Sequence, residues 1–128
     1  GPVELGKAAV RKTGKDITLL SWSKSANDCL SAATLLAEKG IDAEVIDLRT
    51  LWPWDRETVL NSCAKTGHLL VVHEAVQAAG FGAEIAATVA EQLGVRVNRL
   101  GAPRIPVGYS PGLEAVSRIG PEAIEAAV

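Results

Sequence analysis

The stretch that decides the fold is ITLLSWSKSANDCLSAATLLAEKGIDAEVIDL, residues 17–48, in which a helical pattern separates two short β-rich runs. The runs are Ile17–Trp22 and Ala43–Leu48. Between them, over residues 25–39, apolar residues recur at the spacing of an amphipathic helix. A hairpin turn cannot contain a helical crossover of this length, so the two strands are predicted to be parallel. The face of the helix predicted to be buried carries Ala26, Cys29, Leu30, Ala33, Leu36 and Ala37.

The same alternation of strand and helix continues toward the C-terminus. A short helix starting at Pro53 and Asp55 precedes the nearly continuous apolar run of residues 68–72, which is typical of a parallel strand covered on both faces. Gly80-Phe81-Gly82 then leads into a second amphipathic helix, and residues 95–100 form a fourth strand. The buried faces of these two helices are predicted to carry Val59, Leu60 and Cys63 in the first, and Ile85, Ala86, Val89 and Leu93 in the second.

The ends of the chain complete the prediction. Residues 7–11 add an edge strand, residues 102–112 form a loop rich in proline and glycine, and a terminal helix follows Pro121. Strands joined by helices imply right-handed crossovers and helices on both faces of the sheet. The predicted fold class is therefore three-layer α/β/α, with four parallel strands and an edge strand.

Composition bounds the function. The chain has 128 residues, 48% hydrophobic and 22% charged, with a net charge of −2, which fits one domain. Its 13 basic and 15 acidic residues leave no basic footprint for nucleic acid or an anionic membrane. No apolar run approaches the roughly 20 residues of a membrane-spanning helix, and no signal peptide is recognised. We expect residues 1–2 to be a tag scar and residues 3–128 to form one cytoplasmic domain.

Two motifs resemble catalytic signatures and fail on chemistry. Gly108-Tyr-Ser-Pro-Gly112 matches the nucleophile elbow G-x-S-x-G, but Pro111 lacks the N–H that this residue must donate to the oxyanion. The glycine turn at residues 80–82 has Ile85 where a dinucleotide fingerprint needs its third glycine. We therefore expect neither hydrolase activity at Ser110 nor a nucleotide site at this turn.

The histidines and tryptophans are the remaining candidates. His68 and His73 lie five residues apart, which puts them on opposite faces of an extended strand and about 16 Å apart, so a shared metal is not expected. His73 and Glu74 end a predicted strand, where open α/β sheets place ligands, or they fix a loop or a subunit contact. The segment Trp52-Pro-Trp54 flanks a turn, where one ring can enter the core and the other contact a partner.

Four ordered blocks of the chain resemble one family. They are Val45-Ile-Asp-Leu-Arg-Thr-Leu-Trp-Pro-Trp-Asp55, Lys65-Thr-Gly-His-Leu-Leu-Val-Val-His-Glu-Ala75, Gly80-Phe-Gly-Ala-Glu-Ile-Ala-Ala87 and Ile105-Pro-Val-Gly-Tyr-Ser-Pro-Gly-Leu-Glu114. Together they are similar to the C-terminal, transketolase-like domain of β subunits of thiamine-diphosphate-dependent 2-oxo acid dehydrogenases. The resemblance covers nearly the whole chain, from Leu5 onward.

The resemblance implies a five-stranded sheet in the order 1-3-2-4-5 with the first strand antiparallel. It also implies a function that these residues do not carry themselves. The family oxidatively decarboxylates a 2-oxo acid of the pyruvate or branched-chain type and passes the acyl group to a lipoyl arm. Thiamine diphosphate and Mg²⁺ belong to other domains of such enzymes, so no cofactor, metal or catalytic residue is expected here. The implied location is cytoplasmic, or the mitochondrial matrix in a eukaryote.

This domain would then serve assembly, with the α subunit, a second β subunit and the acyltransferase core as implied partners. Two alternatives stay open: the equivalent domain of a transketolase or 1-deoxyxylulose-5-phosphate synthase, and a free-standing interaction module. The contact surface is predicted at the carboxyl edge of the sheet, where aromatic residues and prolines stand among small residues. Its candidate residues are His73, Glu74, Phe81, Tyr109, Leu113 and Trp54.

Overall fold

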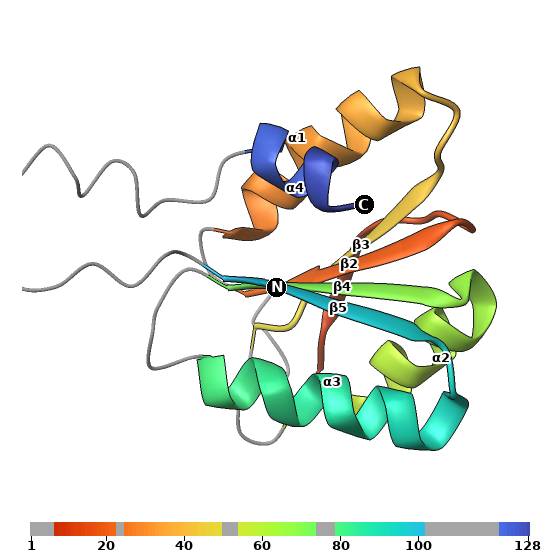
Figure 1. Ribbon diagram of the computed structural model, residues 1–128, viewed down its shortest axis with the longest axis vertical. Coiled ribbons are helices and arrows are strands. Elements are labelled where there is room, and N and C mark those ends of the chain that lie inside the picture. Colours follow the sequence, from red (N-terminus) through yellow and green to blue (C-terminus); the bar gives the residue numbers. More distant parts are fainter. Residues whose placement is uncertain (1–6, 23–24, 50–53, 74–78, 102–120) are drawn as a thin grey trace, which may run out of the picture.

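The computed structural model describes residues 7–22, 25–49, 54–73, 79–101 and 121–128, and their arrangement is that of three layers (Figure 1). A five-stranded sheet lies in the middle. Helices α1 and α4 cover one face, and α2 and α3 cover the other (Figure 1). The predicted three-layer α/β/α class is confirmed.

The strands match the sequence prediction to within about two residues. Their order in the sheet is β1-β3-β2-β4-β5, with β1 antiparallel to β3 and the other pairs parallel. This order is the one that the family resemblance implies. The strand bounds are β1 Ala9–Lys12, β2 Ile17–Ser21, β3 Ala43–Asp47, β4 His68–His73 and β5 Arg96–Gly101.

The four helices of the described residues also follow the predicted pattern. One difference concerns α3, which begins at Ala79, so Gly80, Phe81 and Gly82 lie within its first turn and do not form a turn that precedes it. The glycines do not prevent helix formation here, because the apolar face of α3, which begins at Ile85, packs in the core. The helix bounds are α1 Ser25–Glu38, α2 Arg56–Thr66, α3 Ala79–Leu93 and α4 Pro121–Ala127.

Two hydrophobic cores flank the sheet and share β2. All five residues of β2 are buried: Ile17 and Leu19 face α1 and α4, and Leu20 faces α2 and α3. Because side chains alternate along a strand, β2 supplies apolar groups to both layers, as a central parallel strand requires. Thr18, also fully buried, packs toward α2, where its hydroxyl lies 2.7 Å from that of Ser62.

The buried face of α1 differs from the prediction at three positions. Ala26, Cys29, Ala33 and Leu36 are buried as expected, but Leu30 is only partly buried, Ala37 is exposed and Ala32 is buried. At 100° per residue, the arc centred on Cys29 and Leu36 includes Ala32. Ala37 lies at the margin of that arc, near the end of the helix, beyond the reach of the sheet.

Both ends of α2 are capped. Asp55, one of the two residues predicted to start this helix, is its N-cap, and its carboxylate accepts a hydrogen bond from the Thr58 backbone N–H at 3.2 Å. Gly67 ends the helix with φ of 72°, a left-handed conformation that glycine adopts without strain. Pro53, the other residue predicted to start this helix, lies outside the described residues.

None of the described helices is long and apolar enough to cross a bilayer.

The packing of α4 leads to a first prediction. Ile124, fully buried, inserts into the core beside α1, while Val10 on β1 is 49% exposed. We expect Ile124→Ala to lower the free energy of unfolding by about 2–5 kcal/mol, because it deletes buried methyl groups and leaves a cavity. The matched control Val10→Ala should change it by less than about 0.5 kcal/mol. Urea denaturation of the two variants measures both, and equal losses would show that α4 does not contribute to the core.

Candidate functional site

The four parallel strands bring their carboxyl ends to one edge of the sheet (Figure 1). β2 ends at Ser21, β3 at Asp47, β4 at His73 and β5 at Gly101. In open α/β sheets this edge is where ligands and partners bind. The contact surface predicted from the sequence is therefore expected at this edge.

The predicted surface requires that β4 and β5 are neighbours in the sheet. β4 and β5 are hydrogen-bonded neighbours in parallel register, with Val72 opposite Leu100 and His73 opposite Gly101. The chain segments after these two strands therefore start side by side, as the prediction assumed. The side chains of His73 and Phe81, and residues Glu74, Tyr109 and Leu113 altogether, lie outside the described residues, as does Ser110.

Trp54 is described, and its ring lies inside this chain. Only 7% of the residue is exposed, and it packs in the core with Leu48, Val59 and Ile85. The guanidinium of Arg56 sits 5.4 Å from the centre of the ring, within the range of a cation–π contact. The structure thus gives Trp54 a core role, and its predicted part in an interface stays a prediction.

A charged cluster that the sequence analysis missed lies at the end of β3. The guanidinium groups of Arg11, on β1, and Arg49 each approach the same Asp47 carboxylate oxygen at 3.8 Å. The other Asp47 oxygen accepts the Arg49 backbone N–H at 3.1 Å. This bond holds Arg49 at φ of 56°, a left-handed conformation that costs a non-glycine residue energy. The sequence feature that could have predicted this cluster is Asp47, which ends an apolar strand two residues before Arg49.

The cysteines are buried and chemically quiet. Burial raises the pKa of Cys29 to about 12, against the opposing effect of a hydrogen bond with Ser21, whose hydroxyl oxygen lies 3.6 Å from the sulfur. Burial likewise raises the pKa of Cys63 to about 12. Because the thiolate is the nucleophile, neither residue suits covalent catalysis at neutral pH.

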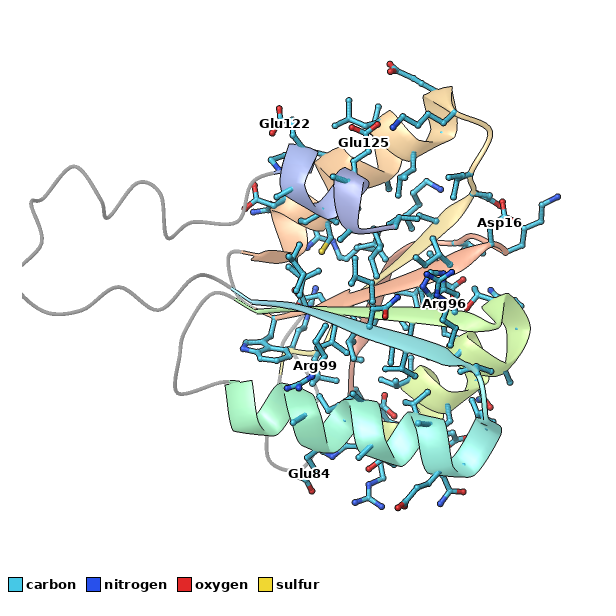
Figure 2. The ribbon with its side chains drawn as sticks, viewed as in Figure 1. Asp16, Glu84, Arg96, Arg99, Glu122 and Glu125 are labelled. Carbon is cyan, nitrogen blue, oxygen red and sulfur yellow. The ribbon has the colours of Figure 1, made fainter. Side chains whose placement is uncertain are left out.

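The two histidines lie at opposite ends of β4, as predicted. His68 is at the amino end, where its Nε2 lies 3.3 Å from the Asn98 side-chain nitrogen. Burial first, and then the charge of Arg96, lowers the pKa of His68, so it is neutral at pH 7. Arg96 and Arg99 leave β5 on opposite faces of the sheet (Figure 2). Among the described residues, no three His, Cys, Asp or Glu side chains gather as a metal site would need.

A second polar cluster occupies the amino edge, between β3 and α2. Glu44, 3% exposed, accepts hydrogen bonds from the Lys65 ammonium and from the Gly14 backbone N–H, the latter at 3.1 Å. Burial raises the pKa of Glu44, but hydrogen bonds from Lys65, Ser62 and Gly14 outweigh it and lower the pKa below its usual value. The carboxylate is thus charged and fully engaged, so it is structural and unavailable as a general base.

Among the described residues, the polar groups set out above are buried or paired, and Arg49 at the carboxyl edge reaches solvent.

Comparison with known proteins agrees with this geometry. The family model of the transketolase C-terminal domain matches residues 6–124. The chain is 40% identical to the mitochondrial β subunit of the pyruvate dehydrogenase E1 component of Dictyostelium discoideum over 121 residues, which are 91% of this chain and 34% of that protein. It is 49% identical over 88 residues to the mitochondrial 2-oxoisovalerate dehydrogenase β subunit of Chaetomium thermophilum, 68% of this chain and 19% of that one.

A solved structure gives the same picture in three dimensions. The chain superimposes on a split-gene transketolase, described as an inactive β4 tetramer, with a TM-score of 0.85 and 29% identity. The match covers 98% of this chain and 42% of that one. Against the Dictyostelium relative, too, the chain spans only about a third of the length.

The burial of the thiols gives a second prediction. In the folded chain at pH 8, Cys29 and Cys63 should react with a disulfide reagent such as DTNB at least about 100-fold more slowly than a free thiol, because both are buried with raised pKa values. The same chain in denaturant serves as the control and should titrate both thiols at once. Rapid labelling of either cysteine in the folded chain would contradict its assignment to the core.

Proposed function

Because this chain belongs to the family of transketolase C-terminal domains, we propose that it is the C-terminal assembly domain of the β subunit of a thiamine-diphosphate-dependent 2-oxo acid dehydrogenase. The observation that carries the proposal is the 40% identity to a pyruvate dehydrogenase β subunit over 91% of the chain. The enzyme would oxidatively decarboxylate a 2-oxo acid and transfer the acyl group to a lipoyl arm.

In this proposal the domain itself is not catalytic. Thiamine diphosphate and Mg²⁺ would be held by other parts of the enzyme, as the family resemblance implies. The domain would contribute rigidity and contact area instead. Its partners would be the α subunit, a second β subunit and the acyltransferase core.

The proposed contact surface is the carboxyl edge around residues 73–81 and 109–113. The neighbouring register of β4 and β5 supports it, because the segments that follow both strands start at the same place. The charged groups of Arg49 and Arg11 lie at the end of β3 on the same edge. An interface of about 800 Å² per partner is a standard size for protein assembly.

A second candidate is the equivalent domain of a transketolase or a 1-deoxyxylulose-5-phosphate synthase, which the likeness to a split-gene transketolase favours. We rank it lower because that likeness has 29% identity, against 40% for the pyruvate dehydrogenase β subunit. A free-standing interaction module is the third candidate. The natural reading frame separates the three: a β-subunit length supports the dehydrogenase, a much longer frame the transketolase class, and a frame close to this chain the module.

For location, we propose the cytoplasm in a bacterium and the mitochondrial matrix in a eukaryote. The proposal follows the relatives, several of which are described as mitochondrial while others come from Bacillus subtilis.

The absence of a cofactor site is directly testable. Titration of this chain with thiamine diphosphate and Mg²⁺ in a calorimeter should give no heat of binding down to micromolar affinity, because the family resemblance places the diphosphate and metal ligands elsewhere. The complete β subunit assembled with its α subunit is the positive control and should bind. Micromolar binding by this chain alone would overturn the non-catalytic assignment.

The contact surface has its own test. In the complete β subunit, Phe81→Ala and Tyr109→Ala should each weaken association by about 1 kcal/mol or more, because aromatic anchors carry much of the energy of interfaces. Val10→Ala, an exposed apolar position on the edge strand β1, is the matched control and should leave association unchanged. Sedimentation at several concentrations measures all three, and association equal to the parent in both aromatic variants would place the interface elsewhere.

A further inference from the structure

The two edges of the sheet are held in different ways. β5 pairs with β4 in unbroken register over six residue pairs, from His68–Arg96 to His73–Gly101. β1 has four residues, and its register with β3 shifts between Val10 and Lys12. We call residues 8–14, which contain β1 and its flanks, the strap. Its backbone ladder is the shorter and less regular of the two.

The strap also makes little apolar contact with the rest of the domain. Val10, its one large apolar side chain, is 49% exposed. A cavity of about 480 Å³ lies between the strap and α2, and it is lined by Val10 and Thr13 of the strap, by Glu44 of β3 and by polar side chains of α2. Ala8 alone in the strap packs against a core cluster among the described residues. Hydrophobic burial therefore contributes little to keeping the strap closed.

Carboxylates on β3 and at the start of α2 accept hydrogen bonds from the strap. Asp55, at the start of α2, accepts the Ala8 backbone N–H at 3.0 Å. Glu44, on β3, accepts the Gly14 backbone N–H at 3.1 Å. The Gly14–Glu44 bond is buried, and the Ala8–Asp55 bond is partly buried. A hydrogen bond to a charged, shielded acceptor is stronger than one between neutral groups.

Two further carboxylates bind the basic side chains of the strap. The Lys12 ammonium lies 3.2 Å from an Asp42 oxygen and also donates to the Ala43 carbonyl at 2.9 Å. Arg11 approaches Asp47 at 3.8 Å. Apart from the β1–β3 backbone pairing, these polar contacts join the strap to acidic side chains and, through Lys12, to the Ala43 carbonyl.

Other cations face the same carboxylates. Lys65 lies on Glu44 and Arg49 on Asp47, while the charge of Lys7 helps to lower the pKa of Asp55. Burial raises the pKa of Asp55, but the bonds from Thr58 and Ala8 outweigh it and lower the pKa. Glu44 and Asp55 are therefore charged at neutral pH, and their bonds to the strap are in place.

We propose that the strap is a separately opening edge of the sheet, held closed by these carboxylates and not by packing. It opens while β2, β3, β4 and β5 stay paired, because among the described residues only Ala8 of the strap packs against a core cluster. Opening uncovers the backbone edge of β3 at Val45, Ile46 and Asp47, the residues that pair with β1. Closed, the strap presents Arg11 and Lys12, charges that discourage pairing with another sheet.

Gly14 anchors the C-terminal end of the strap to β3. A Cβ built at this residue would lie 2.3 Å from the carbonyl carbon of Ala43, so only glycine lets the backbone approach β3 closely enough to reach Glu44.

The test is amide hydrogen exchange of the 128-residue chain at pH 7, comparing peptides over residues 8–14 with those over residues 96–101 of β5 as the internal reference. The strap should exchange at least about tenfold faster than β5 and well before the rest of the sheet. Exchange of both edges together, at the rate of global unfolding, would overturn the proposal.

Variants distinguish the contribution of the carboxylates from that of the β1–β3 backbone hydrogen bonds. Asp55→Asn keeps a good N-cap for α2, because the amide oxygen still accepts from Thr58, but it turns an NH₂ group toward the Ala8 N–H. Strap exchange should rise about tenfold and β5 exchange should stay unchanged. Lys12→Met should raise strap exchange about two- to fivefold, as expected for a partly exposed ion pair.

Lys39→Met is the matched control, because it removes the ion pair between Lys39 and Glu125 on the α4 side of the molecule (Figure 2 labels Glu125). It should leave strap exchange unchanged. Unchanged strap exchange in Asp55→Asn, or equal acceleration of both edges, would show that the carboxylates do not hold the strap.

Discussion

The structure depends on the complete burial of β2. Every residue of this strand is buried, and its alternating side chains enter both hydrophobic cores. A strand with two apolar faces needs a helical layer on each side, so a single sheet with helices on one face would leave either Leu19 or Leu20 in water. The three-layer arrangement follows from this requirement, and the helical crossovers that supply the layers make strands β2 to β5 parallel.

Burial of the centre decides where polar chemistry can lie. Thr18 is fully buried in β2, and it is accommodated because its hydroxyl lies within 2.8 Å of both the Ser62 and Thr66 hydroxyls. The thiols of Cys29 and Cys63 fill core volume and lose their reactivity by the same burial. Charged groups are left at the two ends of the strands and on the edge strand. Such a distribution of polar groups is compatible with the proposed role of this domain in assembly.

The acidic residues around β1 show how such an edge is managed. Asp42, Glu44, Asp47 and Asp55 come from β3, its flanks and the start of α2, yet all four contact the strap. A small sheet has to end somewhere, and an apolar strand at its border would be open to pairing with another chain. Here a short charged strand covers that border by polar contacts, while β5 closes the opposite border by a longer regular ladder.

Periodicity along the chain determined the elements of this protein. Runs of β-branched and leucine residues at 17–22, 43–48, 68–72 and 95–100 and helical spacing between them were sufficient to place the strands, the crossover helices and most of their buried faces, because these patterns are local. The strand order came from the resemblance of four sequence blocks to a family, since local patterns do not say which strands are neighbours. Only the tertiary structure decided the pairs Arg11–Asp47 and Lys65–Glu44 and the burial of Trp54 and Ala32. The reason is that these contacts join residues distant in sequence through strand register and helix rotation, and neither quantity is written in the spacing of any one segment.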